Sequence, residues 1–359
     1  MVETVCAKFV SKKIRKVRWQ RPAAFGRPNP EYFVAGSWDD EQNEVSLWNT
    51  VPANEQNNDP IQVSTVPFPS DVNDISFYDT SNFFVALGNG TVVMMRIDKN
   101  KLEVVHQWKD IHHFKSSKAP ATGVVCQSPE IASIGEDGKI NLMRMNQDKP
   151  YKTIDSFKIT MLSVIFKLSD ADSCSLNAAV FTSQNEIFTG NSRGMIKLWD
   201  LRATTDKPVQ SASLAEDSEI GVTSMDRHPF QGHIVAVGGY DGMLTVYDMR
   251  KAQTPITVME ASDSCLNELR FHPERADHLF TASESGSVWH WVPLAAKTPM
   301  SNGPSTNLWL SGDLATQQLN IKELLPSLPL AVNTVDVCGE SLICGGDNEA
   351  LYYVSNVVF

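Results

Sequence analysis

The sequence has no uninterrupted apolar run long enough to cross a membrane. Spanning a bilayer as a helix takes about 18–20 apolar residues, and no segment of the 359 residues reaches that length. The first residues, MVETVCAKFVSKK, also lack the apolar stretch of a secretory signal. Hydrophobic residues still make up 42% of the chain, which is enough for a packed core. We therefore expect a soluble, intracellular globular protein without a transmembrane segment.

Basic residues are fewer than acidic residues in this sequence. The chain has 31 Lys and Arg against 42 Asp and Glu, a formal net charge of −11, and its pI is about 5.2. A protein whose main task is to coat nucleic acid or anionic membrane is usually strongly basic. The charge balance argues against that class, and we expect no direct nucleic-acid partner.

One short segment departs from this acidity. Residues 8–21 contain seven lysines and arginines and no acid. Such a cluster is typical of a nuclear-import signal or a nucleic-acid patch, but the segment also carries spaced apolar residues, Phe9, Ile14, Val17 and Trp19. We favour the interpretation that the basic side chains form the solvent face of strands whose other face is apolar.

Cysteine is scarce and shows no ligand pattern. The six cysteines include no C-x-x-C pair, and no histidine stands at zinc-site spacing from them. Most lie in strand-like apolar runs such as GVVCQ and LICGG, where a free cysteine behaves as a small hydrophobe. We expect buried, reduced thiols and no metal site.

Catalytic motifs are missing as well. The chain has no P-loop, no G-x-S-x-G, no H-E-x-x-H and no Gly-rich dinucleotide turn. The eight histidines are scattered, and the one adjacent pair, His112–His113, lies in the polar loop HHFKSSKAP, where we expect solvated side chains. The sequence therefore predicts no catalytic residues, no cofactor and no small-molecule substrate.

Two kinds of polar residue recur at equivalent points of the chain and are interpreted as turn residues. His228-Pro229 and His272-Pro273 each follow a predicted inner strand. Asp137, Asp241 and Asp347 each precede a hairpin turn, where a carboxylate can accept the N–H bonds of the turn. We expect structural roles for all of them.

A repeated phrase decides the expected architecture. An apolar strand, a tight turn and a second alternating strand that usually ends in an aromatic residue occur seven times. The clearest copies are EIFTGNSRGMIKLWDLR (186–202) and IVAVGGYDGMLTVYDMR (234–250), and the other five cover 33–48, 83–97, 130–145, 279–292 and 341–355. Their spacing is close to the roughly 40–45 residues of a WD-repeat blade. We predict an all-β, seven-bladed WD-repeat β-propeller that forms a single domain over residues 1–359.

Residues between and within the copies fit four-stranded blades. Gly and Asn tolerate the positive φ of a tight hairpin, and the predicted turn residues are Asn43, Gly90, Gly138, Gly194, Gly242, Gly286 and Asn348. The predicted outer strands are 60–66, 101–108, 151–155, 208–214 and 255–260, and the clearest inner strands are 175–182, 221–229 and 266–273.

The last copy leaves little chain for its own outer strand. It ends at Tyr353–Phe359, whereas AKFVSKK (7–13) precedes the first inner strand and has no other place. We predict that this N-terminal strand completes the last blade and closes the ring, which hides two exposed strand edges.

Two insertions lengthen the repeat, at about 156–171 and 294–317. The first contains FKITMLSVIFKL (157–168), which fits a partner-binding strand or helix, a lid on the chain itself, or a splice-variant insert. The second places Trp309 and Leu310 in a polar loop. That pair is either an anchor into a partner or a latch onto the propeller.

Several ordered phrases resemble one family in particular. AKFVSKKIRKVRW, GSWDDEQNEVSLW, PATGVVCQSPEIASIGEDGKINLMR, LRFHPERADHLFTASESGSVWHW and LLPSLPLAVNTVDV are similar to the small WD-repeat nucleoporin of the Y-shaped outer-ring complex of the nuclear pore. The resemblance covers nearly the whole chain, in order, and includes NLWLSGD of the second insertion. The stretch 156–171 does not fit the family pattern.

The resemblance implies a non-enzymatic scaffold subunit of the nuclear pore complex in the nuclear envelope. Its partners would be other nucleoporins of the Y complex. It would support pore assembly, protein transport and mRNA export, with a kinetochore role in mitosis. Fold alone would not license these implications.

The alternative is a substrate receptor for a cullin-type ubiquitin ligase. WDLR, with Asp200 and Arg202, and YDMR, with Asp248 and Arg250, resemble the W-D-x-R boxes of such receptors on successive blades. The competing structural interpretation is that each arginine pairs locally with its aspartate. We take these four residues, with Trp309 and Leu310, as the candidate partner-binding residues.

Overall fold

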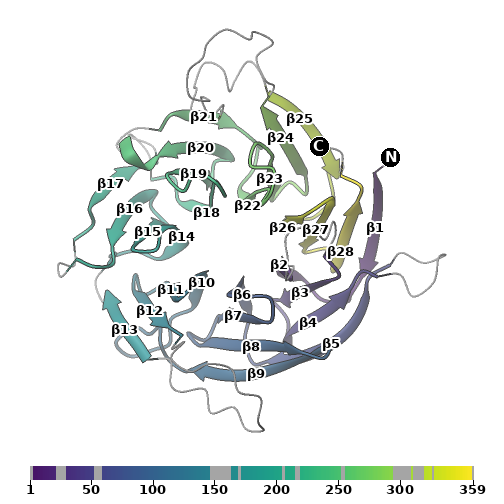
Figure 1. The fold of residues 1–359 in the computed structure, drawn as a ribbon, viewed down its shortest axis with the longest axis horizontal. Coiled ribbons are helices and arrows are strands. Elements are labelled where there is room, and N and C mark those ends of the chain that lie inside the picture. The colour runs from purple at the N-terminus through teal and green to yellow at the C-terminus, as the bar shows by residue number, and fades with distance from the viewer. Residues whose placement is uncertain are drawn as a thin grey trace.

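The structure is a ring of seven antiparallel sheets whose innermost strands surround the central axis (Figure 1), which is the position of the channel in a β-propeller. It is a computed structural model that describes residues 3–21, 30–51, 59–145, 163–168, 171–203, 207–214, 219–251, 255–293, 309, 319–325 and 327–357, with the backbone alone for 163–168 and 293. Each sheet has four strands and runs from the channel to the rim, so the predicted all-β seven-bladed propeller is confirmed.

Blades 1 to 6 are consecutive in sequence. Blade 1 has β2 (Ile14–Trp19), β3 (Tyr32–Ser37), β4 (Asn43–Asn49) and β5 (Ile61–Phe68). Blade 2 has β6 (Val72–Phe77), β7 (Asn82–Leu87), β8 (Val92–Asp98) and β9 (Lys101–Trp108). Blade 3 has β10 (Ala121–Gln127), β11 (Glu130–Gly135), β12 (Ile140–Arg144) and β13 (Ser163–Leu168). Blade 4 has β14 (Leu176–Ser183), β15 (Glu186–Asn191), β16 (Met195–Asp200) and β17 (Gln210–Ser213). Blade 5 has β18 (Val222–Arg227), β19 (Ile234–Gly239), β20 (Met243–Asp248) and β21 (Thr257–Glu260), with a 3-10 turn η1 (Met249–Lys251) after β20. Blade 6 has β22 (Leu266–Phe271), β23 (Leu279–Ser283), β24 (Val288–Pro293) and β25 (Leu319–Leu325).

Blade 7 joins the two ends of the chain, as predicted. It contains β26 (Val332–Cys338), β27 (Ser341–Gly346), β28 (Ala350–Ser355) and the N-terminal strand β1 (Thr4–Phe9). β1 runs antiparallel to β28, with Thr4 opposite Ser355 and Phe9 opposite Ala350. The strand begins and ends a few residues earlier than predicted, because the chain turns at Ser11, whose φ is 57°.

The hairpin turns follow the prediction in five blades. Gly90, Gly138, Gly194, Gly242 and Gly286 all have positive φ, between 69° and 85°. In blade 7 the positive φ belongs to Glu349 (58°) and not to Asn348. In blade 1 the longer loop before β4 places it at Asp39 (54°), and Asn43 becomes the buried first residue of β4.

The outer strand of blade 3 differs from the prediction. β13 pairs with β12 and is formed by Ser163–Leu168, the second half of the segment interpreted as an insertion. The expected outer strand, 151–155, lies outside the described residues. Ser163–Leu168 is rich in β-branched and aromatic residues, which favour a strand position, and its pairing covers the edge of β12.

The innermost strands share one irregularity. In each of them the register to the second strand shifts between the first and third residues, so the second residue stands in a β-bulge. In six blades this bulge residue is Asn or Thr, and its side chain donates a hydrogen bond to the carbonyl of the first residue of the next innermost strand. The bond from Asn333 to the Ile14 carbonyl, 3.0 Å long, joins blade 7 to blade 1. These bonds tie the blades together at the channel.

Apolar clusters between adjacent blades form the core. Val34 and Leu47 of blade 1, for example, pack with Ile75, Phe83 and Met95 of blade 2. All five side chains are at most 1% exposed. The fold is therefore held by packing between blade faces and by hydrogen bonds along the inner edge.

The closing strand generates the first prediction. Deleting residues 1–9 uncovers the edge of β28, so the melting temperature should fall and the protein should self-associate. Differential scanning calorimetry and light scattering would measure both effects. Thr4→Ala, which alters one exposed side chain of β1 and keeps the strand, serves as the control and should leave both unchanged.

Candidate functional site

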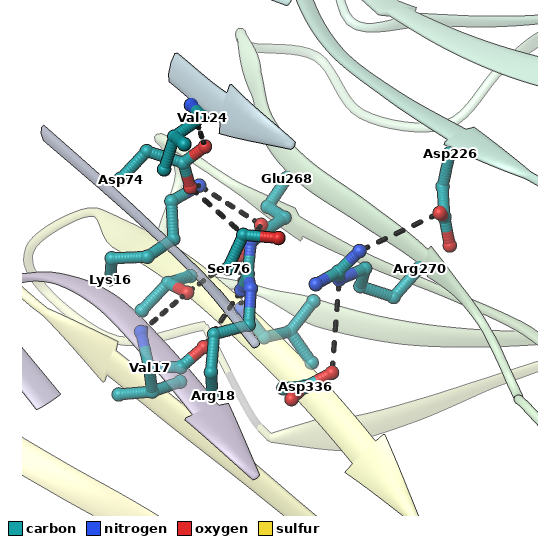
Figure 2. Close-up of polar contacts among 12 residues, drawn as sticks. Lys16, Val17, Arg18, Asp74, Ser76, Val124, Asp226, Glu268, Arg270 and Asp336 are labelled. Atoms are coloured by element: carbon teal, nitrogen blue, oxygen red, sulfur yellow. Dashed lines mark hydrogen bonds and ion pairs between the residues drawn. The ribbon is translucent and has the colours of Figure 1, made fainter. Parts of the chain in front are cut away.

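The innermost strands bring charged residues together at the channel (Figure 2). The third and fifth residues of these strands, counted through the bulge, share one face of the strand. Blades 3 and 4 have small or apolar residues there, whereas the other five blades supply Lys16, Arg18, Asp74, Ser76, Ser224, Asp226, Glu268, Arg270, Thr334 and Asp336.

Glu268 is the most highly connected acid of this cluster. Its Oε1 lies 2.6 Å from Arg18 Nη2 and 3.0 Å from Lys16 Nζ. Its Oε2 accepts hydrogen bonds from the Thr334 hydroxyl and, at 3.0 Å, from the Val335 N–H. Burial alone would raise the pKa of Glu268, but Arg18, Lys16 and Arg270 outweigh it and hold the pKa well below the ordinary value. Glu268 is therefore ionised and saturated with donors.

The remaining channel charges are paired as well. Lys16 and Arg18 reach Asp74 at 3.5 and 3.7 Å, and Arg270 lies between Asp226 and Asp336 at 3.5 and 3.7 Å. Burial would lower the pKa of Arg270, but the two aspartates raise it above the ordinary value. The network compensates three cations with four acids, and its role is to join blades 1, 2, 5, 6 and 7.

The expectation for the basic segment is therefore wrong in part. Ile14, Val17 and Trp19 are buried as predicted, but Phe9 is 66% exposed. The side chains of Lys16 and Arg18 are 16% and 9% exposed and point into the ion network and not to solvent. The alternation K-V-R in β2 was the signal, since its equivalents D-I-S, S-M-D, E-L-R and T-V-D alternate in the same way.

The turn histidines behave as predicted. Nδ1 of His228 accepts N–H bonds from Phe230 and Gln231 at 3.3 and 3.0 Å. His272 Nδ1 accepts from Glu274 and Arg275 at 3.1 and 2.9 Å. Burial lowers the pKa of both imidazoles. A neutral ring with a bare Nδ1 is what these turns require.

His112 contradicts the expectation of a solvated loop histidine. It is fully buried, and its Nδ1 lies 2.8 Å from Asp137 Oδ1, while its Nε2 lies 2.9 Å from the Ser133 hydroxyl. Asp137 also accepts the predicted turn N–H bond, from Lys139 at 3.2 Å. Burial would raise the pKa of Asp137, but His112, the His113 N–H and Lys139 hold it well below its usual range.

The other two turn aspartates differ from one another. Asp241 accepts the N–H of Met243 at 3.1 Å, as expected. Asp347 accepts instead from the side chains of Asn333 (2.6 Å) and Trp38 (3.2 Å).

A histidine pair in blade 6 escaped sequence reasoning. His278 Nδ1 lies 2.8 Å from His290 Nε2, and the rings stack with centroids 5.0 Å apart. Burial lowers the pKa of His278 to about 4 and that of His290 to about 3. The two rings share one hydrogen bond as neutral groups.

All six cysteines are free thiols, two of them buried and four half-buried. Burial raises the pKa of Cys126 and Cys338 to about 12, so these thiols stay protonated. Within the described segments, no three His, Cys, Asp or Glu side chains are placed to hold a metal ion. No helix in those segments has the length and apolar character needed to cross a bilayer.

A cavity of about 310 Å³ opens between blades 1 and 2. Phe68, Leu87 and Val104 give it an apolar lining, and Lys109 and Lys118 also line it. Its lining residues include no acid and no histidine.

The two candidate arginine boxes show the predicted local pairing. Arg202 donates from Nε and Nη2 to Asp200 at 3.0 and 2.9 Å, and Arg250 Nε donates to Asp248 at 2.8 Å. These hydrogen bonds lower the pKa of both carboxyls. The two arginine side chains are still 67% and 62% exposed, at equivalent ends of neighbouring blades.

Trp309 is packed against its own propeller. It is 0% exposed, its ring meets that of Phe271 edge to face at 5.9 Å, and its carbonyl accepts a hydrogen bond from the Thr257 hydroxyl at 3.1 Å. These contacts join blades 5 and 6 and are those of a latch. Leu310 lies outside the described residues.

Comparison with known proteins places this ring among named relatives. Nucleoporin Nup43 of Homo sapiens is 36% identical over 98% of both chains, and Nup43 of Mus musculus gives the same values. The nuclear pore complex protein nup43 of Dictyostelium discoideum is 25% identical over 45% of this chain and 34% of its own length. A family model described as the N-terminal domain of nucleolar protein 10-like proteins matches residues 139–300. The solved WD40 propeller domain of Doa1 superposes with a TM-score of 0.66 over 98% of this chain and 95% of that one, at 15% identity, which supports the fold alone.

The ion network generates a pH prediction. The folded pKa of Glu268 lies below its unfolded value, so its stabilisation is complete above about pH 4.5 and is lost as the pH falls toward the folded pKa. Glu268→Gln should flatten the loss of melting temperature between pH 5 and pH 3. It should also cost about 3–5 kcal/mol at pH 7, because Lys16 and Arg18 lose the nearer of their two shared carboxylates. Glu260→Gln, at an exposed site on β21, is the control, and equal pH slopes for the two variants would contradict the assignment.

The buried tryptophan generates another prediction. Trp309→Ala should lower the free energy of unfolding by about 3–5 kcal/mol, because the ring leaves a cavity between blades 5 and 6. Urea titration measures this loss. Tyr240→Ala removes an aromatic ring that is 56% exposed and should cost under about 1 kcal/mol. Unchanged stability of the Trp309 variant would identify the residue as a partner anchor instead.

Proposed function

The chain belongs to the Nup43 family of WD-repeat nucleoporins, and from this membership we propose that it is a non-enzymatic structural subunit of the outer ring of the nuclear pore complex. Its place there is the Y-shaped complex, where it contacts neighbouring nucleoporins. In that position it supports pore assembly, protein transport and mRNA export, with a kinetochore role in mitosis.

Identity over the full length carries this proposal. The 36% identity to human Nup43 extends over 98% of both chains, so all seven blades take part in the similarity. A shared propeller fold alone would not be sufficient, because many unrelated functions use it.

The polar groups of the ring favour a structural role. Glu268 and Asp137 are held ionised by donors, and His228 and His272 are used by their turns. A general acid or base needs a free proton site near neutral pH, and these groups are committed to intramolecular bonds. The ring has two faces and a rim of fixed shape to which partner proteins can bind.

One observation supports a second candidate, a receptor for a cullin-type ubiquitin ligase. Arg202 and Arg250 are exposed on neighbouring blades and are each held by an aspartate in the same fork geometry. An arginine pre-ordered in this way loses little side-chain entropy when it binds. These residues remain our candidate contacts for a cullin adaptor.

Affinity purification of the full chain distinguishes the two functions. Recovery of the other Y-complex subunits in stoichiometric amounts is the expected result, and recovery of a cullin adaptor in their place would overturn the proposal. Arg202→Ala with Arg250→Ala should leave nucleoporin recovery unchanged. Arg193→Ala, which removes an equally exposed arginine from the other end of blade 4, is the matched control.

A further inference from the structure

The repeat has one exception at its most regular position. In blades 2 to 7 the bulge residue of the innermost strand is Asn or Thr and bonds to the next blade. In blade 1 that residue is Arg15, and among the described residues blade 1 has no such bond to the Val72 carbonyl. The bulge position, which bonds to the next blade elsewhere in the ring, is therefore occupied in blade 1 by an arginine that does not make this bond.

Arg15 lies against Trp38 instead. Its guanidinium carbon is 4.8 Å from the centre of the indole ring. Trp38 follows the last residue of β3 and Arg15 the first of β2, so both lie at the same end of blade 1, at the mouth of the channel. Trp38 is fixed in turn, because its Nε1 donates to Asp347 of blade 7 and its N–H donates to the Lys13 carbonyl at 3.1 Å.

The neighbouring cations are already neutralised. Lys12 pairs with Asp40 at 3.3 Å and Lys13 with Asp39 at 2.5 Å, while Lys16 and Arg18 belong to the channel network. Arg15 has no acid within ion-pair distance in the described part of the chain. Both Arg15 and Trp38 are half-buried, so solvent still reaches the pair.

A guanidinium stacked on an indole is held in one plane with its N–H groups directed outward. That geometry matches a carboxylate, which accepts two parallel N–H bonds. Arginine and tryptophan are also the residue types that dominate the energy of protein interfaces. We propose that the Arg15–Trp38 pair is a docking site for an Asp or Glu side chain of a partner protein at the mouth of the channel.

The charge pattern favours a protein over a nucleic acid as the partner. Binding a phosphate backbone takes several uncompensated cations, and this site has a single one in a chain of net charge −11. A protein interface, by contrast, can take most of its energy from one ordered arginine. The inference deepens the proposed function, since the partner it describes is another subunit of the outer ring.

Comparison of the blades suggests the substitution that best tests the proposed docking site. Arg15→Asn gives blade 1 the residue found at this position in blades 2, 4, 6 and 7. The new amide can donate to the Val72 carbonyl, so the melting temperature should equal or exceed that of the wild type. Binding should fall about 30-fold, the effect of losing a hot spot of about 2 kcal/mol. Arg15→Lys keeps the charge but loses the planar fork, and its loss should be intermediate.

The experiment measures the affinity of the full chain for the reconstituted remainder of the Y complex, together with thermal unfolding. Asn73→Ala, at the same position in blade 2, is the matched control and should lower stability without changing affinity. Arg193→Asn removes a paired arginine from the same face of the ring and should change neither.

Two results would overturn the site. One is an affinity of Arg15→Asn within about two-fold of the wild type. The other is unchanged affinity for the complex with a loss of binding to a single-stranded RNA 20-mer, which would assign Arg15 to phosphate. If the wild-type chain itself fails to bind the complex, that result contradicts the proposed function and, with it, the proposed docking site.

Discussion

The ring depends on hydrogen bonds that run along the channel from six of the seven blades to the next one. A radial sheet has an inner edge with backbone groups that no fifth strand covers, and unpaired groups of this kind weaken a sheet. The β-bulge solves the problem by turning one Asn or Thr side chain toward the neighbouring blade. Acids at the channel do the same for N–H groups, as Asp226 does for Phe271 and Asp336 for Trp19. Asn333 bonds back to Ile14, so the series runs from blade 2 round to blade 1. Between blades 1 and 2 the ion pair of Lys16 with Asp74 takes its place at the channel.

The distribution of charge follows from this construction. Two cations of the basic N-terminal segment, Lys16 and Arg18, are used to neutralise Glu268 and Asp74 inside the ring. Taking these groups out of water is costly, and only several simultaneous partners make it tolerable. The acids left at the surface then set the character that solvent and partners meet. The acidic surface and the basic strand β2 are thus parts of one arrangement, in which Lys16 and Arg18 of that strand are internal.

Much of the fold could be predicted because the hairpin is a local signal. Gly194 and the alternation that ends at Trp199 lie within a few residues of one another, and seven copies identify a closed ring.

The environment of single side chains could not be predicted, because it depends on residues that are distant in the sequence. His112 is buried because Asp137 and Ser133, 25 and 21 residues away, receive its two nitrogens. The direction of Lys16 depended on Glu268, 252 residues away, and period-2 alternation does not distinguish a channel from solvent. β13 was misplaced because it begins only at Ser163, farther from the end of β12 at Arg144 than the repeat predicts. The sequence pattern did not indicate that Arg15 occupies the position where other blades have Asn or Thr. This equivalence became visible only when the β-bulges of all seven blades were compared.

The pairing of β1 with β28 also has a meaning for the order of events during synthesis. β1 is made before the other strands of the ring and finds its partner only when β28, which includes Ser355, has been made. Until then any blade that has formed borders an unfilled gap, and the Trp19 N–H of β2 still lacks its acceptor, Asp336 of β26. Long-range pairing of this kind is slow and exposes strand edges while it waits. The growing ring is therefore most vulnerable to misassociation just before β28 is made, and the pairing of β28 with β1 ends this exposure.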